Sequence, residues 1–315
     1  MNKNYIILAH KNPIQLKRLI EKLNDNFSSF WIHIDKNQDI EPFIDTLNSY
    51  PNLTFVSKRE NGTWGDLGIV KGTINALKEI INSKKEGYCI LISGQDYPIK
   101  NKEKINCYFI KNNGYDFIDV SPIFEVFPTE WKIRLNYYKY NLSNNRGKYI
   151  LFSSKFDKSF FSLNCIKNII KIILYKRDLK FIKEIISNFN KERCIPENLT
   201  PYAGAQWWAL TYQTAIKVVN FIEKNPSFYS YNEYSLLPDE TFFQTIIKHL
   251  SITDSSIKIK ESLTYTNWSR DNCDLPVTFN DSDIDELTGQ PENKLFARKF
   301  DYNYNKEIFN LLHKI

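Results

Sequence analysis

The chain has 315 residues, of which 42% are hydrophobic and 25% are charged. These fractions are close to the averages of globular proteins, and they exclude a wholly disordered or fibrous chain. A formal net charge of +6 is too small by itself to indicate a nucleic-acid-binding protein. The aromatic content of 15% is high, which suits a well-filled core and equally suits stacking on the rings of bases or sugars.

The cysteines and the N-terminal residues indicate the cellular compartment in which the protein is expected. Five widely spaced cysteines without a CxxC pair fit neither a disulfide framework nor a zinc site, and they indicate a reducing compartment. The apolar run at residues 5–9 is too short for a signal peptide, and no run of 18 apolar residues occurs. We therefore expect a cytoplasmic protein that is soluble or held at a membrane surface.

The first 120 residues alternate between short apolar runs and helical patterns. The expected helices include residues 13–23 and 67–81, and the expected strands are residues 5–9, 30–34, 53–56, 88–92 and 117–120. This alternation predicts an α/β fold with an open, mostly parallel sheet covered on both faces. Ligands bind beyond the carboxyl ends of such strands, so Asp35, Trp64 and the loop at residues 93–98 should border one crevice.

Residues 132–193 differ from the rest of the chain in charge. They hold 15 Lys and Arg against 4 Asp and Glu, a balance of +11 that leaves −5 for all other residues. Residues 163–174 and 179–189 are expected to form helices, the first with Ile166, Ile169, Ile170 and Ile173 on its apolar face. Residues 204–315 return to mixed α/β character. We interpret the chain as one domain, residues 1–315, with a basic helical insertion at 132–193 that is a candidate membrane-surface face.

The common short catalytic signatures are absent. The sequence contains no GxGxxG, P-loop, CxxC, HExxH or GxSxG motif, and four histidines are too few for a histidine-rich metal site. Residues 281–286 contain two overlapping D-x-D triplets. Because acids are favourable at the start of a short helix, here one that ends at Gly289, we do not assign a metal site to them.

Two segments place aromatic or acidic residues beside small ones. Asp96 follows a central strand in Ser-Gly-Gln-Asp-Tyr-Pro, where it either projects into the crevice or belongs to an ordinary strand-to-helix turn. Small residues at 204–205 precede Trp207 and Trp208, which either fill the core or supply a stacking surface for a sugar. Since adjacent strand residues face opposite sides, only one of the two tryptophans is expected to line a site.

Two other segments carry adjacent charges. Pro238, Asp239 and Glu240 form a common helix start, and the alternative is that Glu240 is held there as a general base. Arg298 and Lys299 are flanked by apolar residues. They either form a solvated basic turn or act as a pair that neutralises a diphosphate without a metal.

Taken together, these residues resemble the core-2/I-branching β-1,6-N-acetylglucosaminyltransferase and peptide O-xylosyltransferase family, glycosyltransferase family 14. The matching segments stand in the family's order and cover nearly the whole chain, apart from much of residues 132–193. They are Tyr5-Ile-Ile-Leu-Ala-His-Lys11, His33-Ile-Asp-Lys36, Trp64-Gly65, Ser93-Gly-Gln-Asp-Tyr-Pro98, Gly204-Ala-Gln-Trp207, Pro238-Asp-Glu240 and Leu295-Phe-Ala-Arg-Lys-Phe300. The resemblance implies a GT-A fold, inversion of configuration at the donor sugar, and activity without a divalent metal.

The resemblance also implies roles for individual residues. It makes Glu240 the general base. It implies a donor and diphosphate side formed by Lys299, Arg298, Asp35, His10 and Trp64. It implies an acceptor side or cleft lining formed by Asp96, Trp207, Trp268 and Asp239.

One position departs from the family pattern. Val277 stands where family members usually have an arginine that contacts the diphosphate, so either Arg270 or Arg298 replaces it or the donor is bound differently.

We therefore expect an inverting, metal-independent glycosyltransferase without a cofactor. It moves a sugar, with N-acetylglucosamine the first candidate, from a UDP-sugar to a hydroxyl of a glycan acceptor in surface or capsular polysaccharide synthesis. The expected acceptor is lipid-linked and is reached by peripheral contact of residues 132–193 with the inner face of the cytoplasmic membrane. No nucleic acid partner is expected. The alternative is a catalytically inactive glycan- or nucleotide-binding module of the same fold.

Overall fold

A central seven-stranded sheet organises the computed structural model, which describes residues 1–143, 145–176, 178–196 and 199–315. Its strands are β1 (Lys3–Ala9), β2 (Ser28–Ile34), β3 (Leu53–Phe55), β4 (Tyr88–Ser93), β6 (Tyr115–Phe117), β11 (Trp208–Thr211) and β12 (Lys258–Lys260). Their order is β12-β6-β11-β4-β1-β2-β3, and only β11 runs antiparallel to its neighbours. The predicted open, mostly parallel α/β sheet is confirmed. The strand expected at residues 117–120 overlaps β6 only at Phe117, because β6 begins two residues earlier and ends three residues earlier.

Helices cover both faces of the sheet, as the alternation of apolar side chains requires. Within β4, Ile90 and Ile92 pack into one core and Cys89 and Leu91 into the other. The helices of the first core are α1 (Pro13–Leu23), α2 (Glu41–Leu47), α4 (Lys102–Lys111), α12 (Ile284–Thr288) and α13 (Glu307–His313). Those of the second core are α3 (Gly68–Asn82), α9 (Tyr212–Lys224), α10 (Pro226–Asn232) and α11 (Phe242–Thr253). The predicted helices at residues 13–23 and 67–81 correspond to α1 and α3.

Smaller elements complete the framework around the sheet. A three-stranded sheet has the order β13-β14-β5, and a two-stranded one joins β7 to β10. Their strands are β5 (Asp96–Pro98), β7 (Ser121–Pro122), β10 (Tyr202–Ala203), β13 (Thr264–Thr266) and β14 (Phe296–Arg298). Short helices are α5 (Ile123–Val126) and α6 (Trp131–Asn136), and 3-10 turns span Lys158–Phe161, Pro238–Glu240 and Asp281–Asp283.

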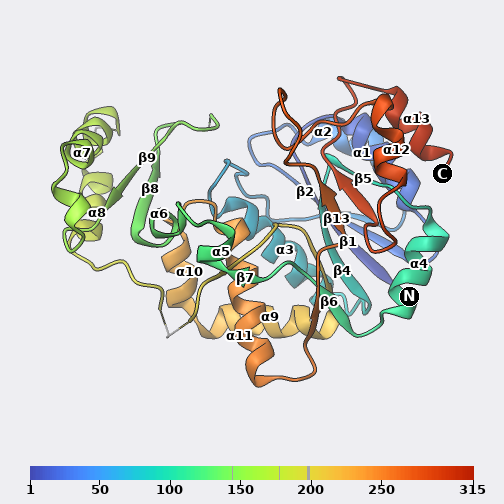
Figure 1. Ribbon diagram of the computed structural model, residues 1–315, viewed down its shortest axis with the longest axis horizontal. Coiled ribbons are helices and arrows are strands. Elements are labelled where there is room, and N and C mark those ends of the chain that lie inside the picture. Colours follow the sequence, from blue (N-terminus) through green and yellow to red (C-terminus); the bar gives the residue numbers. More distant parts are fainter. Residues whose placement is uncertain (144, 177, 197–198) are drawn as a thin grey trace.

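The basic insertion contains strands as well as helices, so its description as purely helical is wrong. A hairpin of β8 (Tyr137–Asn141) and β9 (Tyr149–Ser153) precedes α7 (Leu163–Lys176) and α8 (Leu179–Phe189), the two expected helices. The hairpin and both helices share a separate core, formed by Tyr138, Tyr140, Ile150, Phe152, Cys165, Ile172 and Ile185. Figure 1 shows α7 and α8 at the end of the molecule opposite α12 and α13.

The apolar face of α7 differs from the expected one. Cys165 and Ile172 face the insertion's core, whereas Ile166 and Ile170 are 43% and 52% exposed. The sequence pattern alone does not distinguish the two sides, because α7 is apolar on both. None of the described helices has the length and apolar character needed to cross a membrane.

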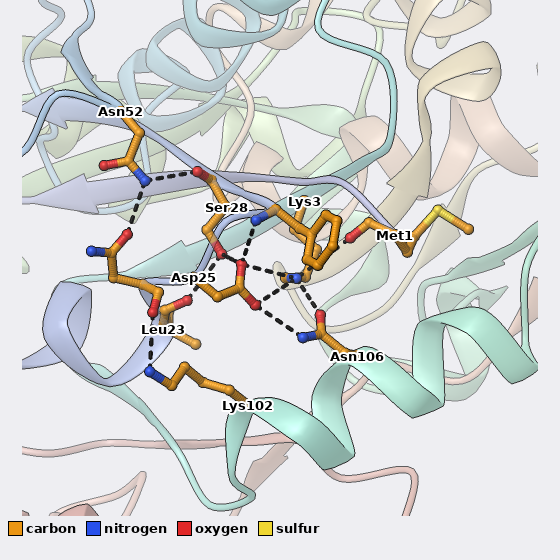
Figure 2. Close-up of polar contacts among 10 residues, drawn as sticks. Met1, Lys3, Leu23, Asp25, Ser28, Asn52, Lys102 and Asn106 are labelled. Atoms are coloured by element: carbon orange, nitrogen blue, oxygen red, sulfur yellow. Dashed lines mark hydrogen bonds and ion pairs between the residues drawn. The ribbon is translucent and has the colours of Figure 1, made fainter.

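A buried lysine ties the start of β1 to two other elements (Figure 2). Lys3 is 1% exposed and pairs with Asp25 at 3.1 Å, and it also donates to Asn106 of α4. Burial lowers the pKa of the Lys3 ammonium. Burial raises the pKa of Asp25, but hydrogen bonds from Ser28 and Asn106 outweigh it, so the net shift is downward. This network fixes the N-terminal edge of the sheet, far in the fold from the carboxyl ends.

Candidate active site

His10 and Asp35 lie side by side at the carboxyl ends of neighbouring strands. Ala9 and Ile34 are partners in the parallel register of β1 and β2, and Asp35 N donates to Ala9 O at 2.9 Å. The Asp35 carboxylate accepts from the Asn37 amide at 2.8 Å. Gly62 faces it closely, since a Cβ at Gly62 would lie 2.7 Å from Asp35 Oδ2. Asp35 thus lies at the carboxyl ends of the strands, and the prediction that it borders one crevice with Trp64 and residues 93–98 stays a prediction.

Asp96 does not project into the crevice as predicted. It is 0% exposed, because β5 pairs antiparallel with β14 and sets Asp96 opposite Arg298. Its carboxylate accepts from Ser93 N at 2.7 Å and from Arg298 Nη1 at 2.9 Å. Burial raises the pKa of Asp96, against the lowering effect of the Arg298 charge. Asp96 therefore holds Arg298 in place instead of lining the cleft.

Arg298 covers the tryptophan that was expected to form a sugar platform. Its guanidinium lies 4.6 Å from the ring centroid of Trp207, which is 6% exposed. Trp208 packs on Phe243 at 5.2 Å, and both tryptophans belong to the same core. The prediction that the two tryptophans face opposite sides stays a prediction. Trp207 supports Arg298, and its face is not open to a ligand.

Lys299 lies within a group of positive charges. Burial lowers the pKa of the Lys299 ammonium, and the charges of Arg298 and Lys11 lower it further. Its backbone is fixed by hydrogen bonds of 3.2 Å to Val277 O and 2.9 Å from Phe279 N. Lys11 pairs with Asp301 at 2.6 Å. A concentration of cations at the end of a sheet is an arrangement that binds anions.

Gln15 of α1 joins the two loops that carry these charges, and sequence reasoning missed it. It is 1% exposed and donates to Gly94 O at 2.7 Å and to Phe300 O at 3.1 Å. Its Oε1 accepts from Tyr302 N at 2.8 Å. A polar residue buried on an apolar helix face was the available signal. Gln15 therefore fixes the loop after β4 against the segment after β14.

Glu240 lies in a 3-10 turn, so the prediction that Pro238 opens an α-helix is wrong. The turn ends at Thr241, and α11 begins at Phe242. Leu237 enters it with a left-handed backbone (φ 53°), and its N–H donates to Gly65 O at 3.1 Å. Gly204 N donates to Glu240 O at 3.0 Å. These bonds bring the segments of Trp64-Gly65, Gly204 and Glu240 together.

A buried arginine from the insertion orients the Glu240 carboxylate. Arg134 is 5% exposed, and its Nη1 donates to Glu240 Oε2 at 2.8 Å. The guanidinium lies 3.5 Å from the ring centroid of Phe127 and also pairs with Glu130 at 3.4 Å. Sequence reasoning counted Arg134 only as part of a basic segment, because the chain offers no signal that it meets Glu240.

Asp239 is a buried carboxyl next to Glu240 in the same turn. It is 7% exposed, and its Oδ1 has no hydrogen-bond partner within the described part of the chain. Burial and the charge of Glu240 raise its pKa to about 7, while the charges of Arg134 and Arg298 lower it. Asp239 is therefore within electrostatic reach of both arginines.

Trp64 and Trp268 are the two accessible aromatic candidates. Trp64 is half-buried and its ring centroid lies 6.1 Å from that of Tyr149 in the insertion. Trp268 follows β13 and is 60% exposed. Thr266 of β13 pairs with Arg298 of β14, so Trp268 follows a strand of the same small sheet that carries Arg298.

Neither Val277 nor Arg270 supplies a second diphosphate cation. Val277 is 2% exposed and packs in the core. Arg270 pairs with Asp283 at 2.8 Å and with Glu286 at 2.6 Å, and these contacts raise its pKa. The same acids belong to the capped 3-10 turn and the helix α12, which fits the prediction that residues 281–286 are a helix start.

Within residues 1–143, 145–176, 178–196 and 199–315 there is no cluster of three or more His, Cys, Asp or Glu side chains placed to hold a metal ion. The expectation of metal independence stays a prediction.

The family assignment follows from comparison with known proteins. The model of the family described as "Core-2/I-Branching enzyme" matches residues 4–288. The chain belongs to this family. The family is one of glycosyltransferases, and the predicted family is confirmed.

Curated relatives are similar over nearly the whole chain but are much longer. A xylosyltransferase of Ciona intestinalis is 24% identical over 98% of this chain and 33% of its own length. Xylosyltransferase 2 of Homo sapiens is 23% identical over the same 98% and 33%. The chain thus spans about a third of the length of these relatives. Among solved structures, a 4-diphosphocytidyl-2C-methyl-D-erythritol synthase of Anaerococcus prevotii is 11% identical over 91% of this chain and 95% of its own, with a TM-score of 0.38, a likeness too weak to inform the fold.

Proposed function

We propose that the protein transfers a sugar from a UDP-sugar to a hydroxyl of a glycan acceptor, with inversion and without a metal ion. One observation carries the proposal. The Glu240 carboxylate is fixed by the buried Arg134, and the Arg298 guanidinium is fixed by the buried Asp96. The segment at residues 204–207 joins the two halves, because Gly204 N donates to Glu240 O and Arg298 lies over the Trp207 ring.

Each half performs one part of a single displacement. Glu240 accepts the proton of the acceptor hydroxyl as that oxygen forms its bond to the anomeric carbon. The bond from that carbon to the diphosphate oxygen breaks, and the electron pair leaves with UDP. Lys299 and Arg298 stabilise the negative charge that develops on the leaving diphosphate. Attack opposite the leaving group inverts the configuration.

The donor side is assigned to the carboxyl ends of β1 and β2. There Asp35 follows β2 and His10 follows β1; the family resemblance implies that Asp35 contacts the nucleoside and that His10 belongs to the donor side. N-acetylglucosamine is the first candidate for the sugar. The relatives named xylosyltransferases add UDP-xylose as the second donor to test. On the acceptor side, the exposed Trp268 offers a ring face to a sugar.

The test of the base is the variant Glu240→Gln, which keeps shape and removes the proton acceptor. We expect UDP binding by calorimetry to persist while transfer from a panel of UDP-sugars falls by at least about a hundredfold. Glu233→Gln is the matched control, because Glu233 is a surface glutamate paired with Lys71 at 3.3 Å. Turnover close to wild type in Glu240→Gln would refute the assignment.

Two outcomes of the same panel separate the alternatives. If the wild-type protein binds UDP but transfers no sugar, the inactive binding module is the correct description. Transfer that persists in EDTA supports the metal-independent reaction, whereas a strict requirement for Mn²⁺ would contradict it.

We also propose that the insertion holds the enzyme at an anionic membrane surface, on the cytoplasmic side, where it meets a lipid-linked acceptor. On α7, Leu163, Ile166 and Ile170 are 77%, 43% and 52% exposed, and on α8 Leu179 is 77% exposed. Lysines accompany these apolar side chains along both helices, and exposed basic and apolar residues on one helix favour the interface of anionic lipid. The basic residues of this prediction are Lys167, Lys171, Lys176, Arg177, Lys180 and Lys183, of which Arg177 lies outside the described residues.

The membrane proposal is tested by sedimentation with vesicles. Wild type should sediment with phosphatidylglycerol vesicles and much less with phosphatidylcholine vesicles. The double variant Ile166→Ser/Ile170→Ser should lose this binding. Ile252→Ser is the matched control, since Ile252 is 69% exposed on α11 of the main body. Absence of wild-type binding would show that the basic segment is only a solvated surface.

A further inference from the structure

The tip of the β8–β9 hairpin carries an arginine onto an aromatic residue of the site. The guanidinium of Arg146 lies 5.0 Å from the ring centroid of Trp64. The turn includes Gly147 in a left-handed conformation (φ 76°), and Leu142 N donates to Lys148 O at 2.8 Å. Trp64 adjoins the Glu240 turn through the bond from Leu237 N to Gly65 O.

The base of the hairpin is anchored to the same segment as Trp64. The side chain of Lys139 is 1% exposed, pairs with the Asp66 carboxylate, and donates to Asn141 Oδ1 at 2.8 Å. Asn141 also donates to Asp66. Tyr149 packs on the Trp64 ring. A buried ion pair and a ring contact thus hold the hairpin against the Trp64 loop, which limits where its tip can lie.

Arg146 adds positive charge where charge is already concentrated. Its charge is one of those that lower the pKa of Lys299, after burial, Arg298 and Lys11. Arg298 and Lys11 each have a carboxylate partner, Asp96 and Asp301. By contrast, Arg146 forms no ion pair with any residue that the structure describes. Since Arg146 has no such counter-charge, its position near other cations is more favourable when an anion is bound there.

We propose that Arg146 is a diphosphate-binding residue, and that the insertion hairpin delivers it over Trp64 to the donor site, where it acts as a third cation with Lys299 and Arg298. This inference rests on the proposed function for the identity of the anion. A guanidinium can bond two phosphate oxygens at once, and stacking on Trp64 would hold its plane for that contact. Arg146 then contributes to stabilising the leaving diphosphate, and the insertion becomes part of the donor site.

Calorimetric titration with UDP and UMP tests the inference without requiring turnover. Loss of one charge-assisted contact of about 1.5–3 kcal/mol should weaken UDP binding by Arg146→Ala roughly 10- to 150-fold. UMP, with one phosphate fewer, should be affected less. Arg146→Lys should recover part of the affinity, because it keeps the charge and loses the planar fork. Lys148→Ala is the matched control, since Lys148 is an exposed cation two residues further along the same turn.

The outcomes separate this inference from the proposed function. If wild type transfers sugar but Arg146→Ala binds UDP as tightly as wild type, the role of Arg146 is wrong and the proposed function stands. If wild type binds UDP without transferring sugar, the proposed function fails and the affinity ratio still decides the role of Arg146. Equal losses in Arg146→Ala and Lys148→Ala would indicate nonspecific charge attraction and overturn the inference, as would a wild type that does not bind UDP.

Discussion

Replacing Asp239 by asparagine should stabilise the protein at neutral pH and have little effect in mild acid. Asp239 is buried beside Glu240, and its Oδ1 has no hydrogen-bond partner in the described chain. Burial first, and then the charge of Glu240, raises its pKa from the ordinary value of 3.8 to about 7. Charging this carboxyl in the folded protein therefore costs free energy that the unfolded chain does not pay.

The sign and size of the effect follow from this difference. A carboxyl whose pKa is raised by folding contributes stability below its unfolded pKa and loses that contribution as the pH rises through its folded pKa. Each tenfold ratio of acid constants corresponds to about 1.36 kcal/mol. As the pH rises from 3.8, the ordinary pKa of the carboxyl, to about 7, its pKa in the folded protein, the unfolding free energy of wild type should fall by about 4 kcal/mol because of Asp239. Asparagine does not titrate, so the variant should keep it.

Urea titrations from about pH 4 to about pH 8 measure the effect. The difference in unfolding free energy between Asp239→Asn and wild type should rise from near zero to about 4 kcal/mol across this range. The same comparison in a Glu240→Gln background is the informative control, because removing the neighbouring charge should lower the pKa of Asp239, so that the rise ends at a lower pH and at a smaller value. A difference that does not vary with pH would refute the reasoning.

Two further predictions concern the buried Lys3–Asp25 ion pair and the close approach of Gly62 to Asp35. Asp25→Ala should lower the unfolding free energy by about 3–5 kcal/mol, since it leaves the buried ammonium of Lys3 without a carboxylate. Lys3→Met should cost less, because Asp25 is 16% exposed and keeps its bond from Ser28 Oγ at 2.7 Å; equal losses in urea titrations would contradict this asymmetry. Gly62→Ala should weaken UDP binding about tenfold, because a Cβ 2.7 Å from Asp35 Oδ2 forces that carboxylate to move, and unchanged calorimetric affinity would count against Asp35 as a nucleoside contact.

The fold class could be predicted because local signals and burial agree in the first half of the chain. The strands β1, β2 and β4 are apolar runs buried on both faces, and α1 begins at Pro13 after a capping Asn12. The hairpin of the insertion was not predicted, because the high positive charge of residues 132–193 does not distinguish strands from helices. The available signal was the two-residue spacing of the core-facing tyrosines along β8. Tyr138 and Tyr140 face the insertion's core.

The candidate site was harder to predict because its contacts join residues far apart in the sequence. Asp96 looked like a residue at a strand end, and only its pairing with Arg298, 202 positions later, makes it a buried support. Arg134 meets Glu240 across 106 positions. No local pattern specifies such pairs, since they depend on how the small sheet and the insertion pack against the main sheet. The motifs therefore indicated candidate site residues, but they did not indicate which residues those side chains contact.

Some cations of the insertion are buried and others are exposed on its surface. Only the exposed ones are useful targets for a membrane-binding experiment. Arg134 and Lys139 are paired with Glu240 and Asp66, and Arg193 is 7% exposed and bonded to Ser235. These three cations are buried and cannot attract lipid, so the balance of +11 overstates the charge that faces solvent. Neutralising them would disturb the fold or the site instead. The informative variants are therefore the exposed helix lysines, among them Lys167 and Lys171, whose loss should weaken vesicle binding while UDP affinity stays unchanged.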